Sequence, residues 1–153
     1  MTQIAESAPR PLRLDDQLCF ALYAATNAVT RAYAPLLAQY KLTYPQYLVM
    51  LVLWQDGPSL SGRIATRLGL GANAITPLVD KLVASGLVER HHDDTDRRTV
   101  TIQLTQAGLE LEDAVSLVQQ SVVCRTALEP EALARLRQEL IELANRLGGP
   151  RQA

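Results

Sequence analysis

The sequence predicts a mainly α-helical fold with one small β-hairpin, and three observations carry this prediction. Apolar residues recur at helical spacing through long stretches near both ends of the chain. Two short helical patterns separated by glycines lie in the middle, and a run of β-branched residues follows them. The 153 residues, 48% of them hydrophobic and 20% charged, suffice for one domain with a buried core. We expect this domain at residues 13–153, after a short disordered arm at residues 1–12.

The first helical pattern extends from residue 14 to about residue 40. Its apolar residues follow steps of three and four, as one face of a helix requires. They are Leu14, Leu18, Leu22, Ala25, Val29, Ala32 and Leu36. Because proline lacks the backbone N–H that a helix interior needs, we expect Pro35 to break or kink this pattern, which leaves one long helix or two in tandem.

A capping-box motif marks the start of the second helix. The Thr43 hydroxyl can accept a hydrogen bond from one free backbone N–H, and the Gln46 side chain can accept from another. Pro45 suits the first helical turn, where no backbone donor is needed. Residues 47–54 form the most apolar run of the chain, so we expect a buried helix that ends near Gln55.

Residues 59–85 have the spacing of a helix-turn-helix motif. Two helical patterns flank Gly69 and Gly71, which permit a sharp turn between them. The residues expected to pack across this turn are Ile64, Ala65, Leu68, Ile75, Leu78 and Leu82. The second pattern, at about residues 72–85, would be the recognition helix that enters the major groove.

Two weaker motifs in this region favour neither a cofactor nor a metal. Residues 69–74 fit a GxGxxA dinucleotide fingerprint, but that fingerprint must follow a buried strand, and residues 60–68 have helical spacing instead. His91 and His92 are neighbours on an expected strand and would point to opposite faces. We therefore expect no cofactor and no metal site.

A β-hairpin is predicted directly after the helix-turn-helix. Its strands are expected at about residues 87–91 and 99–104, with charged, turn-forming residues between them. A helix-turn-helix followed by a hairpin is a winged helix, here residues 59–104. Thr105 can then cap a helix that ends near Arg125, and Pro130 opens a last helix that ends at Gly148.

The last helix has a leucine seam that favours a partner helix. Its leucines alternate steps of three and four, and they are Leu133, Leu136, Leu140, Leu143 and Leu147. The seam alone fits packing within one chain equally well. Together with a motif that reads half of a DNA site, it favours a homodimer on a pseudo-palindromic operator. Residues 13–56 and 105–148 would then form the dimerisation helices and the sensing pocket.

DNA binding would have to rest on locally placed charge. The chain has 15 basic and 16 acidic residues and a formal net charge of -1, which does not indicate a nucleic-acid or anionic-membrane partner. Residues 59–101 hold six basic and five acidic residues.

Asp80 can accept from a cytosine amine or pair with an arginine. The other candidate contacts to bases or phosphates are Arg63, Arg67, Asn73, Thr76, Pro77 and Lys81.

The tip of the wing holds Asp96, Arg97 and Arg98. An arginine here can enter a narrow minor groove, where the potential is most negative, and Asp96 can hold the guanidinium of Arg98 in place. The alternative is a solvated hairpin loop without a DNA contact.

Two cysteines, Cys19 and Cys124, lie far apart without a CxxC motif, which excludes a disulfide framework and a zinc site. Cys19 lies one helical turn before Tyr23, and Tyr33 and Tyr44 flank the next helix junction. Phenolic donors and an early helix position favour the reactive thiolate, whereas two aspartates one turn earlier oppose it. The alternative is an inert cysteine on an apolar helix face.

The sequence shows no targeting or membrane segment. Residues 1–11 lack the charged start and apolar run of a signal peptide. The apolar run at residues 47–54 is far shorter than the roughly 20 residues that span a bilayer. We expect a cytoplasmic protein without a membrane partner.

The segment from LDDQLCFALY to LTYPQYLVMLVLW, residues 14–54, resembles the N-terminal half of the organic-hydroperoxide-sensing repressors of the MarR family. The wing sequence DRR followed by LTQAG is similar to MarR proteins generally, so the resemblance covers about residues 14–147. Its first half is the specific part, and it implies the two-cysteine type of these repressors.

The resemblance assigns roles to individual residues. It implies that Cys19 is the peroxidatic cysteine, and that Cys124, from the partner subunit, is the resolving cysteine. Tyr33 and Tyr44 match the tyrosines that hydrogen-bond to the reactive sulfur, and Tyr23 matches a further aromatic residue of the pocket. In the wing, Asp96 matches the anchoring acid and Arg98 the minor-groove arginine.

The function expected from this resemblance is that of a repressor and not of an enzyme. An organic hydroperoxide would oxidise Cys19 to a sulfenic acid, which would condense with Cys124 and release the dimer from double-stranded operator DNA. Two alternatives remain, namely a MarR-type repressor released by a phenolic ligand and a thiol peroxidase.

Overall fold

The computed structural model describes residues 11–149, so the expected arm lies almost entirely outside the described residues. The described part is mainly helical with a small antiparallel sheet, which confirms the predicted fold class. Its elements are a 3-10 turn at Leu14–Asp16, α1 (Leu18–Ala38), α2 (Tyr44–Asp56), β1 (Ser59–Leu60), α3 (Ser61–Leu68), α4 (Ala72–Ala84), β2 (Val88–His92), β3 (Val100–Leu104), α5 (Gln106–Arg125) and α6 (Pro130–Arg146).

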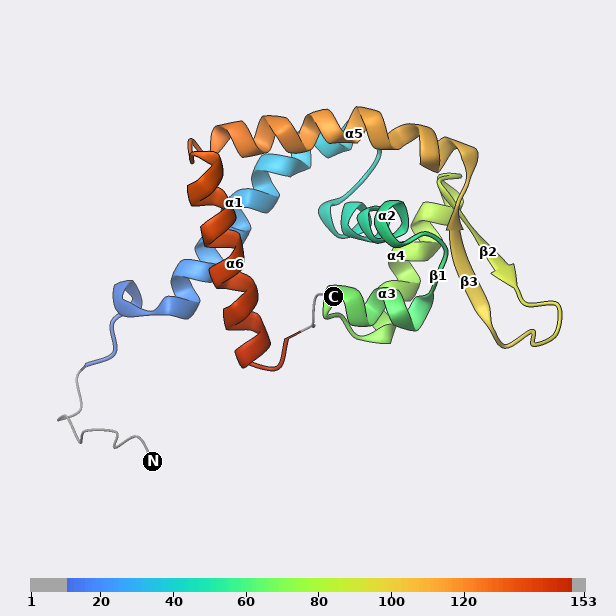
Figure 1. The fold of residues 1–153 in the computed structure, drawn as a ribbon, viewed down its shortest axis with the longest axis horizontal. Helices are drawn as coiled ribbons and strands as arrows, with labels where there is room; N and C mark the ends of the chain where they lie inside the picture. The colour runs from blue at the N-terminus through green and yellow to red at the C-terminus, as the bar shows by residue number, and fades with distance from the viewer. Residues whose placement is uncertain (1–10, 150–153) are drawn as a thin grey trace.

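Helix α5 connects two groups of elements (Figure 1). Helices α2, α3 and α4 and the sheet lie toward its N-terminal end, and α6 descends from its C-terminal end. Helix α1 packs against α5 and also contacts α2. Within residues 11–149, no helix combines the length and the apolar character that crossing a bilayer requires.

Helix α1 is continuous through Pro35, so the chain does not break there into two helices. A proline removes one helical hydrogen bond, and here its ring fits the helix without ending it. The chain instead changes direction earlier, because Gln17 is extended between the 3-10 turn and α1. Of the two arrangements that the pattern allowed, the structure has one long helix.

The capping box at the start of α2 is present as predicted. The Thr43 hydroxyl accepts from the backbone N–H of Gln46 at 3.4 Å, and the Gln46 side-chain oxygen accepts from the backbone N–H of Thr43 at 3.0 Å. These bonds fix the entry of α2, whose apolar residues Val49, Met50 and Leu53 are fully buried. Gly57 ends the helix with a φ of 75°.

The helix-turn-helix is formed by α3 and α4, as predicted. Gly69 ends α3 in the left-handed conformation with a φ of 66°, which a residue with a side chain rarely adopts. Ile64 of α3 and Ile75 and Leu82 of α4 are completely buried, so they hold the two helices together as expected. The segment before the glycines is a helix, which removes the structural basis for a dinucleotide fingerprint.

The sheet has three strands in the order β1-β3-β2, whereas the sequence predicts only the hairpin. In the hairpin, Val88 pairs with Leu104 and His92 pairs with Val100. The additional strand pairs Ser59 with Ile102. Two residues are too few for a recognisable strand pattern in the sequence. Strand β1 is defined by its pairing with β3.

A compact junction joins the sheet to α5. The Thr105 hydroxyl caps α5 by accepting from the backbone N–H of Gly108 at 3.1 Å, and it donates to the carbonyl of Gly86 at 2.6 Å. The indole N–H of Trp54 donates to the carbonyl of Gly108 at 2.9 Å. The end of α2, the start of β2 and the start of α5 are therefore held at one point.

The buried core lies between α1, α2, α3, α4, the sheet and α5, and α6 contributes no buried residue to it. The leucine seam of α6 remains largely uncovered, and Leu136 and Leu140 are 44% and 40% exposed. Since the seam does not pack into the core of its own chain, the structure favours a partner helix over packing within one chain.

Candidate DNA interface and candidate redox site

The predicted recognition helix exposes one polar face. On α4, Ile75, Val79 and Leu82 are buried against the core, which orients the helix. The exposed residues of the opposite face are Asn73, Thr76, Pro77, Asp80 and Lys81. Their spacing places them side by side on the helix, so four of the predicted contact residues share one surface.

Asp80 forms an ion pair with Arg90 of β2. Of the two roles that the sequence left open for Asp80, the structure therefore shows pairing with an arginine. Both side chains are partly solvated, so the pair adds little stability. Its consequence is positional, because it connects the recognition helix to the first strand of the wing.

The wing tip is held by aspartates that accept hydrogen bonds from the backbone. Asp96 accepts from the backbone N–H of Arg98 at 3.0 Å, and not from its guanidinium as predicted. This two-residue spacing is that of an Asx turn, which brings the carboxylate to the main chain. Asp93 accepts from the N–H and the hydroxyl of Thr95 at 2.9 and 2.8 Å, and these bonds lower the pKa of Asp93.

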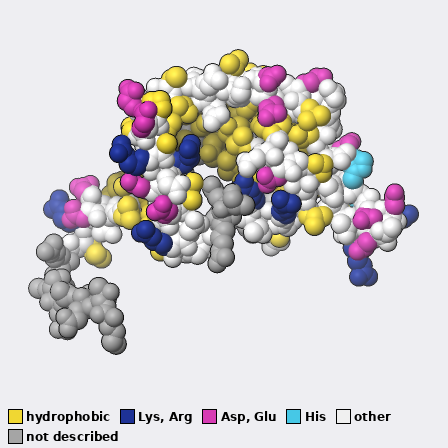
Figure 2. Space-filling model, viewed as in Figure 1, with side chains coloured by type: hydrophobic (Ala, Val, Ile, Leu, Met, Phe, Trp, Pro, Cys, Tyr) yellow, Lys and Arg dark blue, Asp and Glu magenta, His cyan; other side chains and the backbone are white. Residues whose placement is uncertain are grey.

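The guanidinium groups of Arg97 and Arg98 are exposed and form no ion pair with any described residue. Figure 2 shows basic side chains projecting from the outer end of the wing, with acidic ones beside them. The positive charge is therefore available to a partner.

The two arginines of α3 differ in their surroundings. Arg63 is exposed. Arg67 donates from Nε to Asp56 Oδ2 at 3.2 Å, and the two side chains are only 22% and 14% exposed. The guanidinium of Arg67 thus joins α3 to the end of α2, so the structure gives it a role within the fold.

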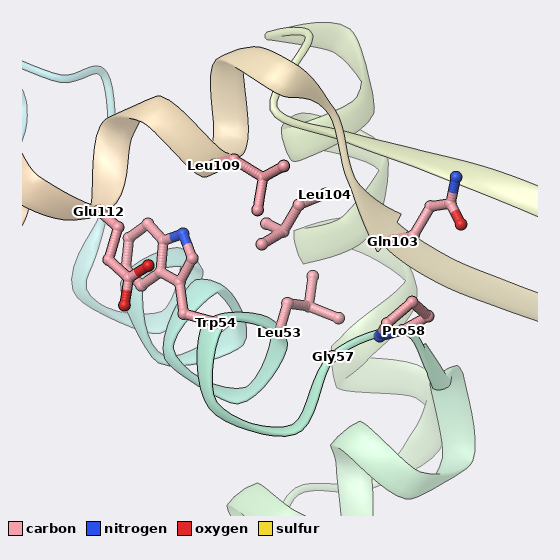
Figure 3. A pocket seen from close by; sticks show the side chains of 8 residues that line it. All are labelled: Leu53, Trp54, Gly57, Pro58, Gln103, Leu104, Leu109 and Glu112. Atoms are coloured by element: carbon pink, nitrogen blue, oxygen red, sulfur yellow. The ribbon is translucent and has the colours of Figure 1, made fainter.

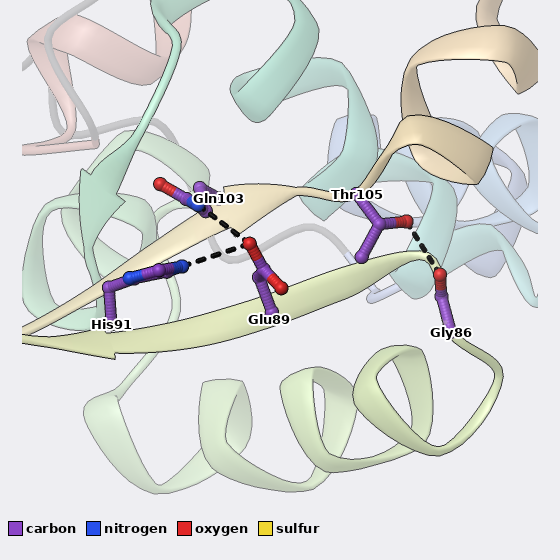
Figure 4. A network of polar contacts seen from close by, with 5 residues as sticks. All are labelled: Gly86, Glu89, His91, Gln103 and Thr105. Atoms are coloured by element: carbon purple, nitrogen blue, oxygen red, sulfur yellow. Dashed lines mark hydrogen bonds and ion pairs between the residues drawn. The ribbon is translucent and has the colours of Figure 1, made fainter.

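A polar network stiffens the hairpin (Figure 4). Glu89 accepts from the side-chain amide of Gln103 at 2.7 Å and contacts the His91 ring at 2.9 Å. These two hydrogen bonds lower the pKa of Glu89. His91 thus serves the hairpin, and no group of three described His, Cys, Asp or Glu residues is placed to hold a metal ion.

A small cavity of about 380 Å³ lies beside the junction between the sheet and α5 (Figure 3). Leu53 and Trp54 of α2 face Leu104 and Leu109 across it, and the Glu112 carboxylate lies at its edge. The cavity lies beside the contact between α2 and the start of α5, and none of the predicted site residues lines it.

Cys19 is exposed in the first turn of α1, and Cys124 is exposed near the end of α5. Both thiols are free. Cys19 and Tyr33 lie on the same continuous helix, about 21 Å apart at a rise of about 1.5 Å per residue. Within one chain, the predicted sensing cysteine therefore does not contact Tyr33, although Tyr23 is one turn away from it and exposed.

Three tyrosines form a cluster between α1 and α2. The ring centroids of Tyr33 and Tyr44 are 5.2 Å apart, and those of Tyr33 and Tyr47 are 5.4 Å apart in a stacked arrangement. Burial raises the pKa of all three phenols, so they remain protonated donors at neutral pH. Sequence analysis missed Tyr47, although its place three residues after Tyr44 in a helix is the signal for a shared face.

A large apolar groove adjoins this cluster. It has a volume of about 640 Å³, and Figure 2 shows the apolar hollow in the middle of this face of the molecule. Val29 of α1, Tyr44 of α2 and Val123 of α5 line one part of it. Three leucines of the α6 seam line the other, namely Leu133, Leu136 and Leu140. Arg137 is the basic residue of its lining.

Residues 31–115 match the family described as transcriptional regulator SarA/Rot. The chain is 42% identical to the HTH-type transcriptional regulator TtmR of Methylorubrum extorquens (strain PA1), over 90% of this chain and 70% of TtmR. It is 32% identical to the organic hydroperoxide resistance transcriptional regulator of Bacillus subtilis (strain 168), over 89% of this chain and 92% of that protein.

The chain is also similar to solved structures of DNA-bound transcriptional regulators. Overoxidised AbfR bound to DNA has a TM-score of 0.73 at 33% identity, over 88% of this chain and 95% of that one. Reduced AbfR bound to DNA has a TM-score of 0.72 at 32% identity, over 88% and 94%. A mutant MarR from E. coli in complex with operator DNA has a TM-score of 0.73 at 22% identity, over 82% and 92%, and shares the fold.

Proposed function

The chain belongs to the SarA/Rot and MarR-type family of winged-helix transcriptional regulators, and from this premise we propose that it is a DNA-binding repressor that organic hydroperoxides release by oxidising Cys19. The family and the relatives are transcriptional regulators and not enzymes. The proposed assembly is a cytoplasmic homodimer on a pseudo-palindromic operator, with the recognition helices in successive major grooves about 34–36 Å apart.

One observation carries the sensing proposal: the exposed Cys19 adjoins an uncovered apolar segment, while Tyr44 lines an open apolar groove. Leu14 and Leu18 precede Cys19 and are both 61% exposed. In a two-fold dimer, insertion of this segment into the groove of the other subunit covers both apolar surfaces. It also brings Cys19 to the tyrosine cluster that its own chain keeps out of reach.

The proposed chemistry begins at the Cys19 thiolate. The sulfur attacks the terminal oxygen of the hydroperoxide, the O–O bond breaks, and the leaving alkoxide takes a proton to become an alcohol. The product is a sulfenic acid on Cys19. The thiol of Cys124 then attacks this sulfur, a disulfide forms, and one water molecule leaves.

We expect formation of the disulfide to cause the conformational change that releases the DNA. The two sulfurs must come within about 2 Å, so if they start far apart in the reduced dimer, the start of α1 and the end of α5 of the other subunit have to move toward each other. The junction of Trp54, Thr105 and Gly108 connects the start of α5 to the wing. A movement of α5 therefore reorients the winged helix of each subunit. The two recognition helices then no longer match the spacing of the two operator half-sites.

The test is a gel shift on the DNA upstream of the gene, with and without cumene hydroperoxide. We expect the peroxide to release the wild-type dimer and to leave Cys19→Ser bound, because serine does not form a sulfenic acid. We expect Cys124→Ser to oxidise without an intersubunit disulfide and to stay bound unless a small thiol such as glutathione is added.

Other outcomes identify the alternatives. If peroxide releases Cys19→Ser, the redox mechanism is wrong, and release of the same variant by salicylate identifies a ligand-controlled repressor. Catalytic consumption of cumene hydroperoxide in the presence of dithiothreitol, without DNA binding, identifies a thiol peroxidase. If Cys124→Ser is released without added thiol, oxidation of Cys19 alone suffices and Cys124 is not essential as a resolving cysteine.

Arg98→Ala tests the wing. Each wing loses one cation that the proposal places in the minor groove, so we expect about 100-fold weaker operator binding and a salt dependence reduced by about two ions per dimer. Fluorescence anisotropy at several salt concentrations measures both. Arg135→Ala removes an arginine of α6 that is also exposed, and it should change neither. Unchanged affinity and salt dependence for Arg98→Ala would exclude the wing from the interface.

A further inference from the structure

We propose that Asp80 and Arg90 are positioning residues whose ion pair holds the wing at a fixed angle to the recognition helix, so that α4 and Arg98 contact one half-site together. This inference rests on the proposed function, because it requires both α4 and the wing to bind the operator. Neither residue of the pair has to touch a base, since the pair acts by fixing the relative position of two elements that do.

The register of the hairpin places Arg90 on its inner face. Residues that pair directly across an antiparallel ladder lie on the same face of the sheet, and Arg90 pairs with Ile102. Ile102 is 1% exposed, and Val88, two residues before Arg90, is 2% exposed, so this face packs on the core. Arg90 is therefore a charged residue on the inner face of the hairpin, and Asp80 of α4 provides its counter-charge.

The ion pair spans the corner between α4 and β2. Gly86 turns the chain there with a φ of 76°, and the backbone N–H of Leu87 donates to the carbonyl of Leu82 at 3.0 Å. Asp80 lies four residues before the end of α4, and Arg90 is the third residue of β2. Because the pair joins the two elements at a distance from the corner, it limits the angle between them more than the hydrogen bond within the corner does.

The same pair neutralises a charge that would oppose DNA binding. Asp80 lies one helical turn after Thr76 and Pro77, on the exposed face of α4 that we place in the major groove. A carboxylate without a counter-charge would repel the DNA phosphates there. Because both side chains of the pair are partly solvated, it adds little to the stability of the fold, and we place its effect in the DNA complex.

A wing held at a fixed angle increases affinity by preorganisation. When α4 enters the major groove, the wing already points Arg98 toward the minor groove, and no free energy is needed to orient it. Without the ion pair, the two contacts form separately, and Arg98 contributes less to operator binding. The contributions of Asp80 and Arg98 are therefore not additive, although the two residues lie on different elements.

The test is a double-mutant cycle between the ion pair and the wing tip, measured by fluorescence anisotropy on operator DNA at one salt concentration. In the otherwise wild-type protein, we expect Arg98→Ala to weaken binding about 100-fold. In the Asp80→Asn background, it should weaken binding only about 20-fold, a coupling of about fivefold. The direct effect of changing the charge at residue 80 cancels, because the cycle compares Arg98→Ala within each background.

Arg90→Gln tests the other side of the pair. It should reduce the effect of Arg98→Ala as much as Asp80→Asn does, and combining the two substitutions should reduce it no further. Denaturant unfolding of the free proteins should keep its midpoint close to that of the wild type for both variants. A large fall in the midpoint would show that the pair acts on the fold, and it would overturn the inference.

Lys81→Gln is the matched control. Lys81 follows Asp80 on α4 and carries one charge, but it forms no ion pair with any described residue. This substitution should weaken binding and leave the effect of Arg98→Ala at about 100-fold. An undiminished effect of Arg98→Ala in the Asp80→Asn and Arg90→Gln backgrounds, or an equal reduction by Lys81→Gln, would overturn the inference. If Arg98→Ala has no effect in the wild-type protein, the proposed role of the wing is wrong instead.

Discussion

Replacing Gly108 with alanine should lower the free energy of unfolding by about 3 kcal/mol, the upper end of what overpacking in a close-packed site costs. A Cβ atom at this position would lie 2.2 Å from the carbonyl oxygen of Leu87. That oxygen accepts the backbone hydrogen bond of Thr105 at 3.1 Å, so it is held in place from the other side. The new methyl group must therefore push the sheet and α5 apart.

The same displacement should weaken the connection between α5 and the wing. The carbonyl of Gly108 accepts from the Trp54 indole, so a shift of α5 strains that bond as well. Denaturant unfolding at a fixed protein concentration measures the stability. Gly62→Ala is the matched control, because nothing lies within 4 Å of its Cβ position and alanine favours the helix that contains it. Equal stability of the two variants would contradict the close contact.

Leu140→Glu should separate the dimer and weaken operator binding about 1,000-fold. The substitution places a carboxylate in the apolar groove, on the seam that we assign to the interface. Two-fold symmetry introduces the charge twice, and desolvating both charges without partners outweighs the apolar contacts that remain. A monomer binds one half-site only, and the loss of bivalency accounts for the fall in affinity.

Sedimentation velocity and anisotropy with operator DNA check the two parts of this prediction. Gln138→Glu is the matched control, because Gln138 is exposed on the other side of α6 and its substitution adds the same charge. We expect this control to remain dimeric. A dimeric Leu140→Glu with normal affinity would show that the α6 seam lies outside the interface.

Local signals explain the parts of the fold that sequence analysis predicted correctly. The Thr43 capping box, the Gly69 turn and the Thr105 cap each need only residues a few positions apart. Strand β1 has no such signal, because its pairing with β3 depends on residues far along the chain. Pro35 left two arrangements open, because the local rule allows one long helix or two in tandem, and the structure has the continuous α1, which packs against α5.

The candidate DNA interface was also predictable only in part from the sequence. Residue types and spacing identified the exposed face of α4 and the basic wing tip. The atoms in contact depended on the fold: Asp96 accepts from the backbone of Arg98, Asp80 pairs with Arg90, and Arg67 turns toward Asp56. The last two pairs join different elements, and side-chain spacing along one element does not predict such contacts.

The sequence by itself determined the winged-helix order of elements and the position of the cysteine in the first helix, because both follow from local patterns. The tertiary structure alone decided that Tyr33, Tyr44 and Tyr47 form one buried cluster, that Cys19 is out of its reach within the chain, and that the α6 seam stays uncovered. The physical reason is that burial and ring packing arise between helices, where no spacing rule within one helix applies.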